Sequence, residues 1–285
     1  MATTPFTLID THAVPWEGNP GIPGFKRQLL SHDEATSAQV RVDYVPPGIV
    51  PAGLQLPHRH YHNSVTERAY TLFGDFPHWE FSGVRDLEGE LIMFRRHLFM
   101  DRPPKSIHGL MPEPISETGA AILYWNTGPG TGVAEPEAVQ ETVDVPFDGS
   151  ADQDRTEFSD CRLLNSGDLA WRKHPVVAGW KVKPLAGAVK HSGAVCLVHI
   201  PADWTASGEA LEVSVSDTPP WLFVISGDLC LHMAENGARH ELGLREGGFL
   251  QWRTAAALGV PRKSCTDGGC VVLCIGHDLS GRGLT

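Results

Sequence analysis

Short runs rich in apolar residues recur along the whole chain, and glycines and prolines separate one run from the next. AQVRVDYV, AAILYW and GAVCLVHI are typical, and in the first of them apolar and polar residues alternate. Alternate side chains of a strand point to opposite faces, so the pattern predicts many short strands. Long segments with the 3.6-residue period of a helix are missing from the sequence. We therefore expect an all-β fold, either a sandwich or a barrel.

Two segments of the sequence share landmarks in the same order, which indicates an internal duplication. Spacings of eight, six and sixteen residues separate the first four landmarks in both segments. The landmarks are Trp16, Gly24, Leu30, Pro46 and Gly74 in the first segment, and Trp171, Gly179, Leu185, Pro201 and Gly227 in the second. We predict two β domains of similar fold, residues 1–140 and 155–285, with an acidic linker at about residues 128–160.

Three histidines, His58, His60 and His62, occupy alternate positions in the stretch LPHRHYHNSVTERAYTLFGDF. In a strand all three would lie on one face, where two of them could chelate a single ion. Glu67 follows, and a carboxylate from the next strand could complete one face of the metal. The candidate ligand from a distant strand is His108, in DRPPKSIHGLMP, where two prolines fix the backbone. Neutral imidazoles with one carboxylate suit Fe(II), Mn(II), Zn(II) or Ni(II).

These residues resemble the first motif of the cupin superfamily, which is approximately G-x5-H-x-H-x3,4-E-x6-G. The stretch GLQLPHRHYHNSVTERAYTLFG matches it with Gly53, His60, His62, Glu67 and Gly74, and one extra residue precedes His60. The resemblance implies two tandem cupin barrels (double-stranded β-helices, or jelly rolls). It also implies six or more strands in each barrel, with the metal inside.

The second cupin motif, approximately G-x5-P-x-G-x2-H-x3-N, is matched in part by PPKSIHGLMP. This stretch supplies Pro103 and His108. Lys105 replaces the usual glycine, and Pro112 stands where the asparagine would be. The assignment of His108 as a ligand therefore depends more on its position than on its surroundings.

The second half of the chain lacks the histidine pair. The sequence before Gly227 reads LEVSVSDTPPWLFVISG, with Pro219 and Pro220 near the expected ligand positions. FLQWRTAAALGVP offers no histidine where His108 would recur. This half resembles a degenerate, metal-free cupin, retained for structure, for dimerisation or to close the pocket, so we expect one metal ion per chain.

The spacing to Glu67 favours His60 and His62 as the metal pair, while a pair of His58 and His60 stays open as an alternative. Under the favoured assignment His58 lies beside the metal as a catalytic residue, which donates to a substrate oxygen or orients a ligand. Glu67 is expected to bind the metal or, if it does not, to take the substrate proton as a general base.

The resemblance implies a non-haem Fe(II)-dependent dioxygenase that cleaves or oxidises a small carbonyl or enol-type substrate with O2. It extends to the cupins of the anti-sigma-factor type and to those that cleave diketones or hydroxyketones. Of Arg95 and Arg96 only one can point inward, where it would favour an anionic substrate. Two alternatives are a metal-dependent isomerase, lyase or hydrolase that uses no O2, and a non-catalytic metal- or ligand-sensing cupin.

Charge and composition narrow the partners. The net charge is −11 and no run of Lys or Arg occurs, which argues against nucleic acid and anionic membranes. No secretory signal and no apolar run of about eighteen residues is found, so we expect a cytoplasmic protein, a homodimer with a small-molecule substrate. The six cysteines are expected to be reduced, with a zinc or disulfide site at Cys265, Cys270 and Cys274 as the alternative.

Overall fold

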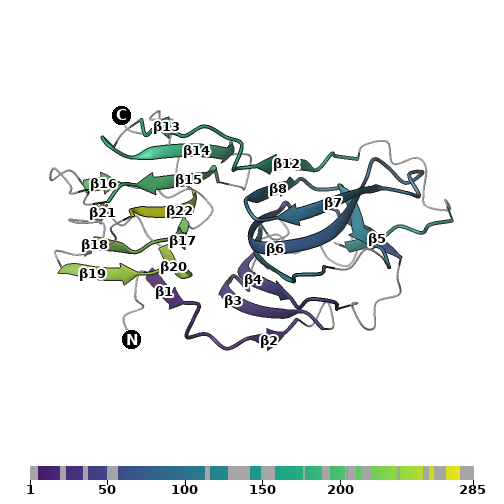
Figure 1. Ribbon diagram of the computed structural model, residues 1–285, viewed down its shortest axis with the longest axis horizontal. Helices are drawn as coiled ribbons and strands as arrows, with labels where there is room; N and C mark the ends of the chain where they lie inside the picture. The colour runs from purple at the N-terminus through teal and green to yellow at the C-terminus, as the bar shows by residue number, and fades with distance from the viewer. Residues whose placement is uncertain are drawn as a thin grey trace. The chain divides into compact units, whose positions relative to one another are not determined.

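The computed structural model describes residues 6–19, 24–34, 38–49, 57–112, 116–127, 142–148, 158–175, 177–187, 193–202, 204, 210–212, 220–235, 238–252, 257–259 and 268–276. All regular elements among them are β-strands, which confirms the predicted all-β class (Figure 1). Within these ranges there is no helix long and apolar enough to cross a membrane. The strands are β1 (Phe6–Asp10), β2 (Glu17–Gly18), β3 (Lys26–His32), β4 (Gln39–Val45), β5 (His58–His62), β6 (Glu67–Phe81), β7 (Glu90–Arg95), β8 (Leu98–Arg102), β9 (Ile107–Leu110), β10 (Ala120–Asn126), β11 (Thr142–Asp144), β12 (Arg162–Asn165), β13 (Arg172–Lys173), β14 (Lys181–Ala186), β15 (Val195–Ile200), β16 (Ala210–Glu212), β17 (Trp221–Ser226), β18 (Leu229–Glu235), β19 (Ala238–Leu244), β20 (Gly248–Trp252), β21 (Ala257–Gly259) and β22 (Cys270–Ile275).

The strands form two compact units whose limits do not follow the order of the sequence. The first barrel is Trp16–Gly167, and the second barrel combines Met1–Pro15 with Asp168–Thr285. Strand β1 pairs with β20 of the second barrel, and β12 pairs with β8 of the first (Figure 1). The ranges expected from the sequence, 1–140 and 155–285, contain no such exchange of strands.

In the first barrel the strands follow the order β11-β5-β9-β6-β10-β4-β3-β2, to which β7, β8 and β12 attach. The long strand β6 pairs through its first part with β8 and β10, and through its last part with β7 and β9. Gly74 lies between these parts with a φ of +78°, and an added Cβ would stand 1.8 Å from the carbonyl oxygen of Gly119. Glycine at this position therefore lets β6 pass from one set of partners to the other.

Among the residues that the structure describes, apolar clusters pack the first barrel. One lies around Phe25 and Phe94 and another around Trp79 and Phe81. The buried members of the former are Phe25, Val45, Ala69, Phe94, Met100, Ala120 and Ile122. Those of the latter are Tyr61, Trp79, Phe81, Ile107 and Val145.

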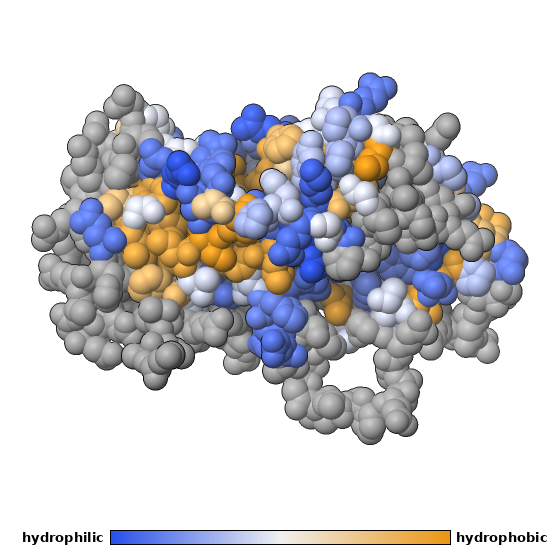
Figure 2. Space-filling model, turned by 90° about the horizontal axis from the view of Figure 1, so that it is seen from below, coloured by the Kyte–Doolittle hydropathy of each residue, from blue (hydrophilic) through white to orange (hydrophobic). Residues whose placement is uncertain are grey.

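The second barrel contains a sheet in the order β1-β20-β17-β22-β15-β14-β13 and a four-stranded sheet, β16-β21-β18-β19. Its core consists of buried apolar side chains from seven of these strands, including Val198, Leu250 and Trp252. Figure 2 shows a continuous apolar area over the part of the molecule that holds β1 and β19. Gly227 has a φ of +79° and abuts the Gly269 carbonyl, as Gly74 abuts that of Gly119, so the two halves share this local geometry.

Several expectations fall outside the described residues. These include Gly53, Pro219, Cys265 and most of the proposed linker. The described cysteines, including Cys270 and Cys274, are free thiols. A zinc or disulfide site that needs Cys265 stays a prediction.

Candidate metal centre

Strand β5 directs His58, His60 and His62 to the inside of the first barrel, as their alternation predicts. The intervening Arg59 is buried on the opposite face and holds this strand in place. Its guanidinium donates hydrogen bonds to the backbone carbonyl oxygens of Val84, Asp86, Val145 and Pro146.

His108, on β9, lies directly opposite His60 in the antiparallel register. The next residue is Gly109, where an added Cβ would stand 1.9 Å from the carbonyl oxygen of His58, so glycine permits the close approach of β5 and β9. Lys105, which replaces the motif glycine before β9, has a φ of +67°, in the left-handed region where glycine is normally found. The turn that positions His108 thus keeps a glycine-like backbone despite the substitution.

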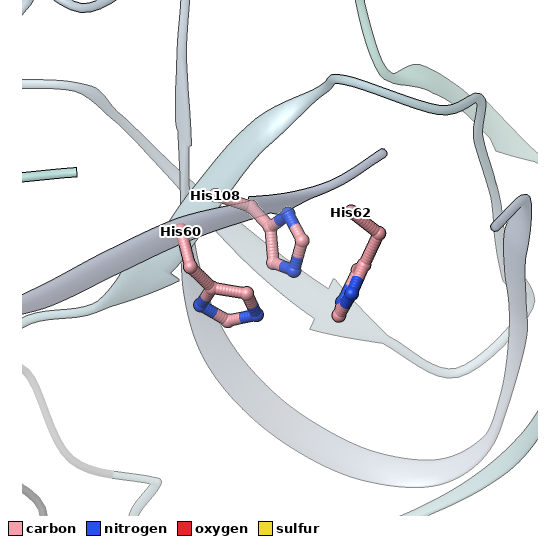
Figure 3. A group of neighbouring side chains, drawn as sticks. All are labelled: His60, His62 and His108. Atoms are coloured by element: carbon pink, nitrogen blue, oxygen red, sulfur yellow. The ribbon is translucent and has the colours of Figure 1, made fainter. Parts of the chain in front are cut away.

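Three imidazoles converge in this barrel. One nitrogen each of His60, His62 and His108 lies within 4.8 Å of the others, and Figure 3 shows the three rings directed into one space. A group of this kind can hold a metal ion. His58 is not part of this group, and its Nε2 instead lies 3.2 Å from Asp144 Oδ1.

Burial keeps the imidazoles of His60 and His108 neutral, which is the form that binds metals. Desolvation lowers the pKa of His60 to about 3 and that of His108 well below its usual value. His108 Nδ1 donates to the Ser106 carbonyl at 3.0 Å, which leaves Nε2 with a free lone pair. His62 Nδ1 lies 3.1 Å from Thr142 Oγ1, within hydrogen-bond distance. His60 Nδ1 is buried and has no hydrogen-bond partner in the part of the chain that the structure describes.

Glu67 faces the same space from the start of β6. Its Oε1 lies 3.4 Å from His62 Nε2 and its Oε2 lies 3.3 Å from His108 Nε2. Metal–ligand bonds of about 2.1 Å place neighbouring ligand atoms about 3 Å apart, so this carboxylate is near enough to share an ion with the histidines. Arg102 Nη1 donates to Oε2 at 2.8 Å, and the Tyr124 hydroxyl donates to Oε1.

The carboxylate of Glu67 is ionised although it is buried. Burial acts to raise its pKa. The electrostatic interaction with His108, a hydrogen bond from His62 and the charge of Arg102 together hold the pKa well below its usual value. Tyr124 has the opposite shift, because burial and then the charge of Glu67 raise its pKa well above the usual value. The pair therefore consists of a carboxylate and a neutral phenol donor.

A second layer of charged groups supports Glu67. Arg102 also donates to Glu80 through Nη2 and Nε, and Glu80 Oε1 lies 3.4 Å from His78 Nδ1. The ring of His78 stacks on that of His108 at a centroid distance of 5.6 Å. Sequence reasoning missed Arg102, Glu80 and Tyr124. The only feature of the sequence that could have indicated them is their inward position in the alternation of their strands.

The histidines open into a pocket of about 620 Å³ inside the first barrel. Three arginines line it: Arg27, Arg41 and Arg102. The expectation that Arg95 or Arg96 points inward is wrong, since both are exposed. The reason is that β7 ends at Arg95, so the pair begins the turn to β8 and does not share the alternation of a strand.

No family model and no curated protein matches this sequence. Solved structures do match it over nearly the full chain. Protein Ylba from E. coli has 10% sequence identity and a TM-score of 0.58, over 95% of this chain and 90% of that one. HEPD from Streptomyces albus, with 2-hydroxyethylphosphonate and Fe(II) bound, has 11% identity and a TM-score of 0.60, over 96% of this chain and 76% of that one.

A variant of the Bacillus subtilis oxalate decarboxylase OxdC has 13% identity and a TM-score of 0.61, over 98% of this chain and 78% of that one. The chain has the cupin fold. The two barrels predicted from the motif are thus confirmed, and the histidine cluster of this cupin lies inside the first of them. At identities this low the likeness describes the fold alone.

Proposed function

We propose that the first barrel binds one divalent metal ion, Fe(II), through His60, His62 and His108, with Glu67 as the fourth ligand. The observation that carries the proposal is the convergence of three imidazole nitrogens within 4.8 Å at a pocket. The buried His60 Nδ1 and the ionised Glu67 fit the same donor set. Mn(II), Zn(II) and Ni(II) suit these donors as well, so the identity of the metal is itself part of the proposal.

The function that we propose is a metal-dependent dioxygenase acting on a small carbonyl or enol-type substrate. The bound metal would supply a Lewis acid and a place for O2. Fe(II) in the HEPD structure, which has the same fold, supports iron as the metal of this site. An isomerase, lyase or hydrolase would use the same site without O2.

The residues around the metal have separate tasks in this proposal. Tyr124 donates to Glu67 and holds its carboxylate toward the histidines. His58 lines the pocket, where its Nε2 donates to Asp144 at 3.2 Å, which leaves Nδ1 as a hydrogen-bond acceptor for a substrate hydroxyl. If Glu67 is not bound to the metal, it is the base that takes the substrate proton.

The test is elemental analysis of untagged protein purified without added metals, followed by O2 uptake on a panel of diketones and hydroxyketones. One iron ion per chain with O2 consumption is the expected result. Turnover that continues without O2 would favour the isomerase, lyase or hydrolase. Metal without turnover on any substrate would favour a sensor.

The second barrel, in this proposal, is a metal-free structural domain and contributes to a homodimer. Its support is the interior, which is filled by apolar residues such as Leu222, Val224 and Val272. In the part of the chain that the structure describes, the metal-binding group of histidines belongs to the first barrel. Sedimentation analysis of the purified protein tests the dimer.

A further inference from the structure

One wall of the metal pocket, formed by β3, β4 and β10, carries two arginines, Arg27 and Arg41. Arg41 has partners within the protein. Arg41 Nε donates to Asp43 Oδ2 at 2.8 Å, and its guanidinium lies 3.8 Å above the ring of Tyr124. Since the Tyr124 hydroxyl donates to Glu67, this wall is connected to the metal ligands through contacts between side chains.

Arg27 has no such partner. It lies opposite Asp43 in the register of β3 and β4, but the two oxygens of Asp43 are already used by Arg41 and, at 3.3 Å, by Asn19 Nδ2. Arg27 Nε is buried and makes no hydrogen bond to any described residue. Two guanidiniums thus face one carboxylate of the pocket, and Arg27 Nε is left without an acceptor among the described residues.

The other charged side chains that line the pocket have partners. Arg102 is paired with both Glu67 and Glu80, and His58 lies beside Asp144. A buried guanidinium N–H without an acceptor is costly, and an ionised oxygen acid is the ligand that best satisfies it. The N–H group of Arg27 that lacks an acceptor is therefore available to a ligand in the pocket.

Part of the pocket lining is apolar. The side chains that line this part are Phe25, Phe76, Phe94, Met100 and Ile122. Such a surface suits a short carbon chain or ring, and the volume of about 620 Å³ is within the range of small-molecule sites.

We propose that this pocket selects organic acids, with the substrate carboxylate bound by Arg27 beside Arg41 and the reacting carbonyl or enol directed to the metal. The orientation of the substrate carbonyl toward the metal rests on the proposed function, whereas the binding of the substrate carboxylate by Arg27 does not. Arg27 is then a specificity-determining residue, which neither the motif nor the fold identifies.

The test uses levulinate, a short keto acid, and methyl levulinate, its neutral counterpart, in calorimetric titrations of the metal-loaded and metal-free full-length protein. We expect levulinate to bind both forms and the ester to bind far more weakly. Arg27→Gln should weaken levulinate binding about tenfold or more, and leave the ester unchanged, because a charged hydrogen bond is lost. Lys26→Gln is the matched control, since it removes the same charge from an exposed position on the same strand.

Arg27→Lys keeps the charge and should retain most of the affinity, which separates loss of binding from loss of fold. Equal affinity of Arg27→Gln and wild type for levulinate overturns the inference, as does equal binding of acid and ester, or no saturable binding of levulinate. Tighter binding of propylphosphonate than of levulinate overturns the carboxylate class in favour of phosphonates. Arg27-dependent binding to protein that holds no metal and consumes no O2 would support this inference and refute the proposed function.

Discussion

Arg102 Nη1 lies 2.8 Å from Glu67 Oε2, and both side chains are buried inside the first barrel. The register of β6 and β8 places the two residues directly opposite one another. A buried carboxylate next to three imidazoles needs a permanent positive charge when no metal is bound, and Arg102 supplies it. The metal centre is therefore supported before any ion arrives.

Replacement of Arg102 by Met should lower the free energy of unfolding by about 3–5 kcal/mol, because Glu67 and Glu80 would be left as buried charges without their partner. Urea denaturation measures the change. Arg95→Met removes an exposed charge and serves as the control, with an expected change within about 0.5 kcal/mol. An unaltered midpoint in Arg102→Met would show that the pair contributes nothing to stability.

Alanine at His60, His62 or His108 should each abolish most metal binding, because each change removes one of the three converging nitrogens. His58→Ala should retain the metal and lose turnover, since its ring lies outside the group. Metal content per chain, measured by elemental analysis, distinguishes the two cases. Retention in His62→Ala together with loss in His58→Ala would favour the alternative pair.

Tyr124→Phe should weaken metal affinity about tenfold, in keeping with the usual effect of removing a hydrogen bond to a metal ligand. The ring that supports Arg41 is preserved, so the stability of the fold should change little. Competition with a chromogenic chelator measures the affinity. Tyr44→Phe, a hydroxyl deletion next to Trp16 and away from the pocket, is the control.

The metal-free protein should lose stability as the pH falls below about 6.5. The pKa of His60 is about 3 in the folded chain, so below pH 6.5 the unfolded chain binds the extra proton and unfolding becomes easier. At a pH of about 5 this one residue costs about 2 kcal/mol relative to neutral pH. Urea midpoints at the two pH values should therefore differ less in His60→Gln than in wild type, and an equal difference would contradict the low pKa.

Gly74→Ala should destabilise the fold by about 2 kcal/mol or more, because the backbone has positive φ and the methyl group would meet the Gly119 carbonyl oxygen. Gly83→Ala is the matched control, since nothing lies within 4 Å of a Cβ at that position. Thermal melting of the two variants gives the comparison. Similar melting temperatures would show that β6 can bend without glycine.

The convergence of the three histidines could be predicted because the information is local. A strand alternates its side chains, so His60 and His62 had to share a face once β5 was recognised as a strand. His108 could be placed because prolines and the motif position mark the start of its strand. The glycine pair of the two halves, Gly74 and Gly227, likewise shares positive φ.

The supporting residues could not be predicted because they depend on register between strands distant in sequence. Glu67 lies opposite Arg102 in the pairing of β6 with β8. In the pairing of β6 with β10 it lies opposite Asn126, which brings Tyr124, two residues earlier on β10, close to its carboxylate. A shift by one residue in either pairing would have turned the same side chains outward, and nothing in the sequence fixes that choice. The pairings of β1 with β20 and of β12 with β8 also join strands that are distant in sequence, so the sequence did not predict them either.

These two pairings also affect how the chain can fold during its synthesis. Strand β1 is translated before the whole of the first barrel, yet its partner β20 is translated after it. The first barrel, in turn, stays incomplete until β12 has been translated. Contacts of such long sequence separation form slowly, so neither barrel can be completed by translating its own half of the gene, and a cut between the halves would leave each with the wrong strand.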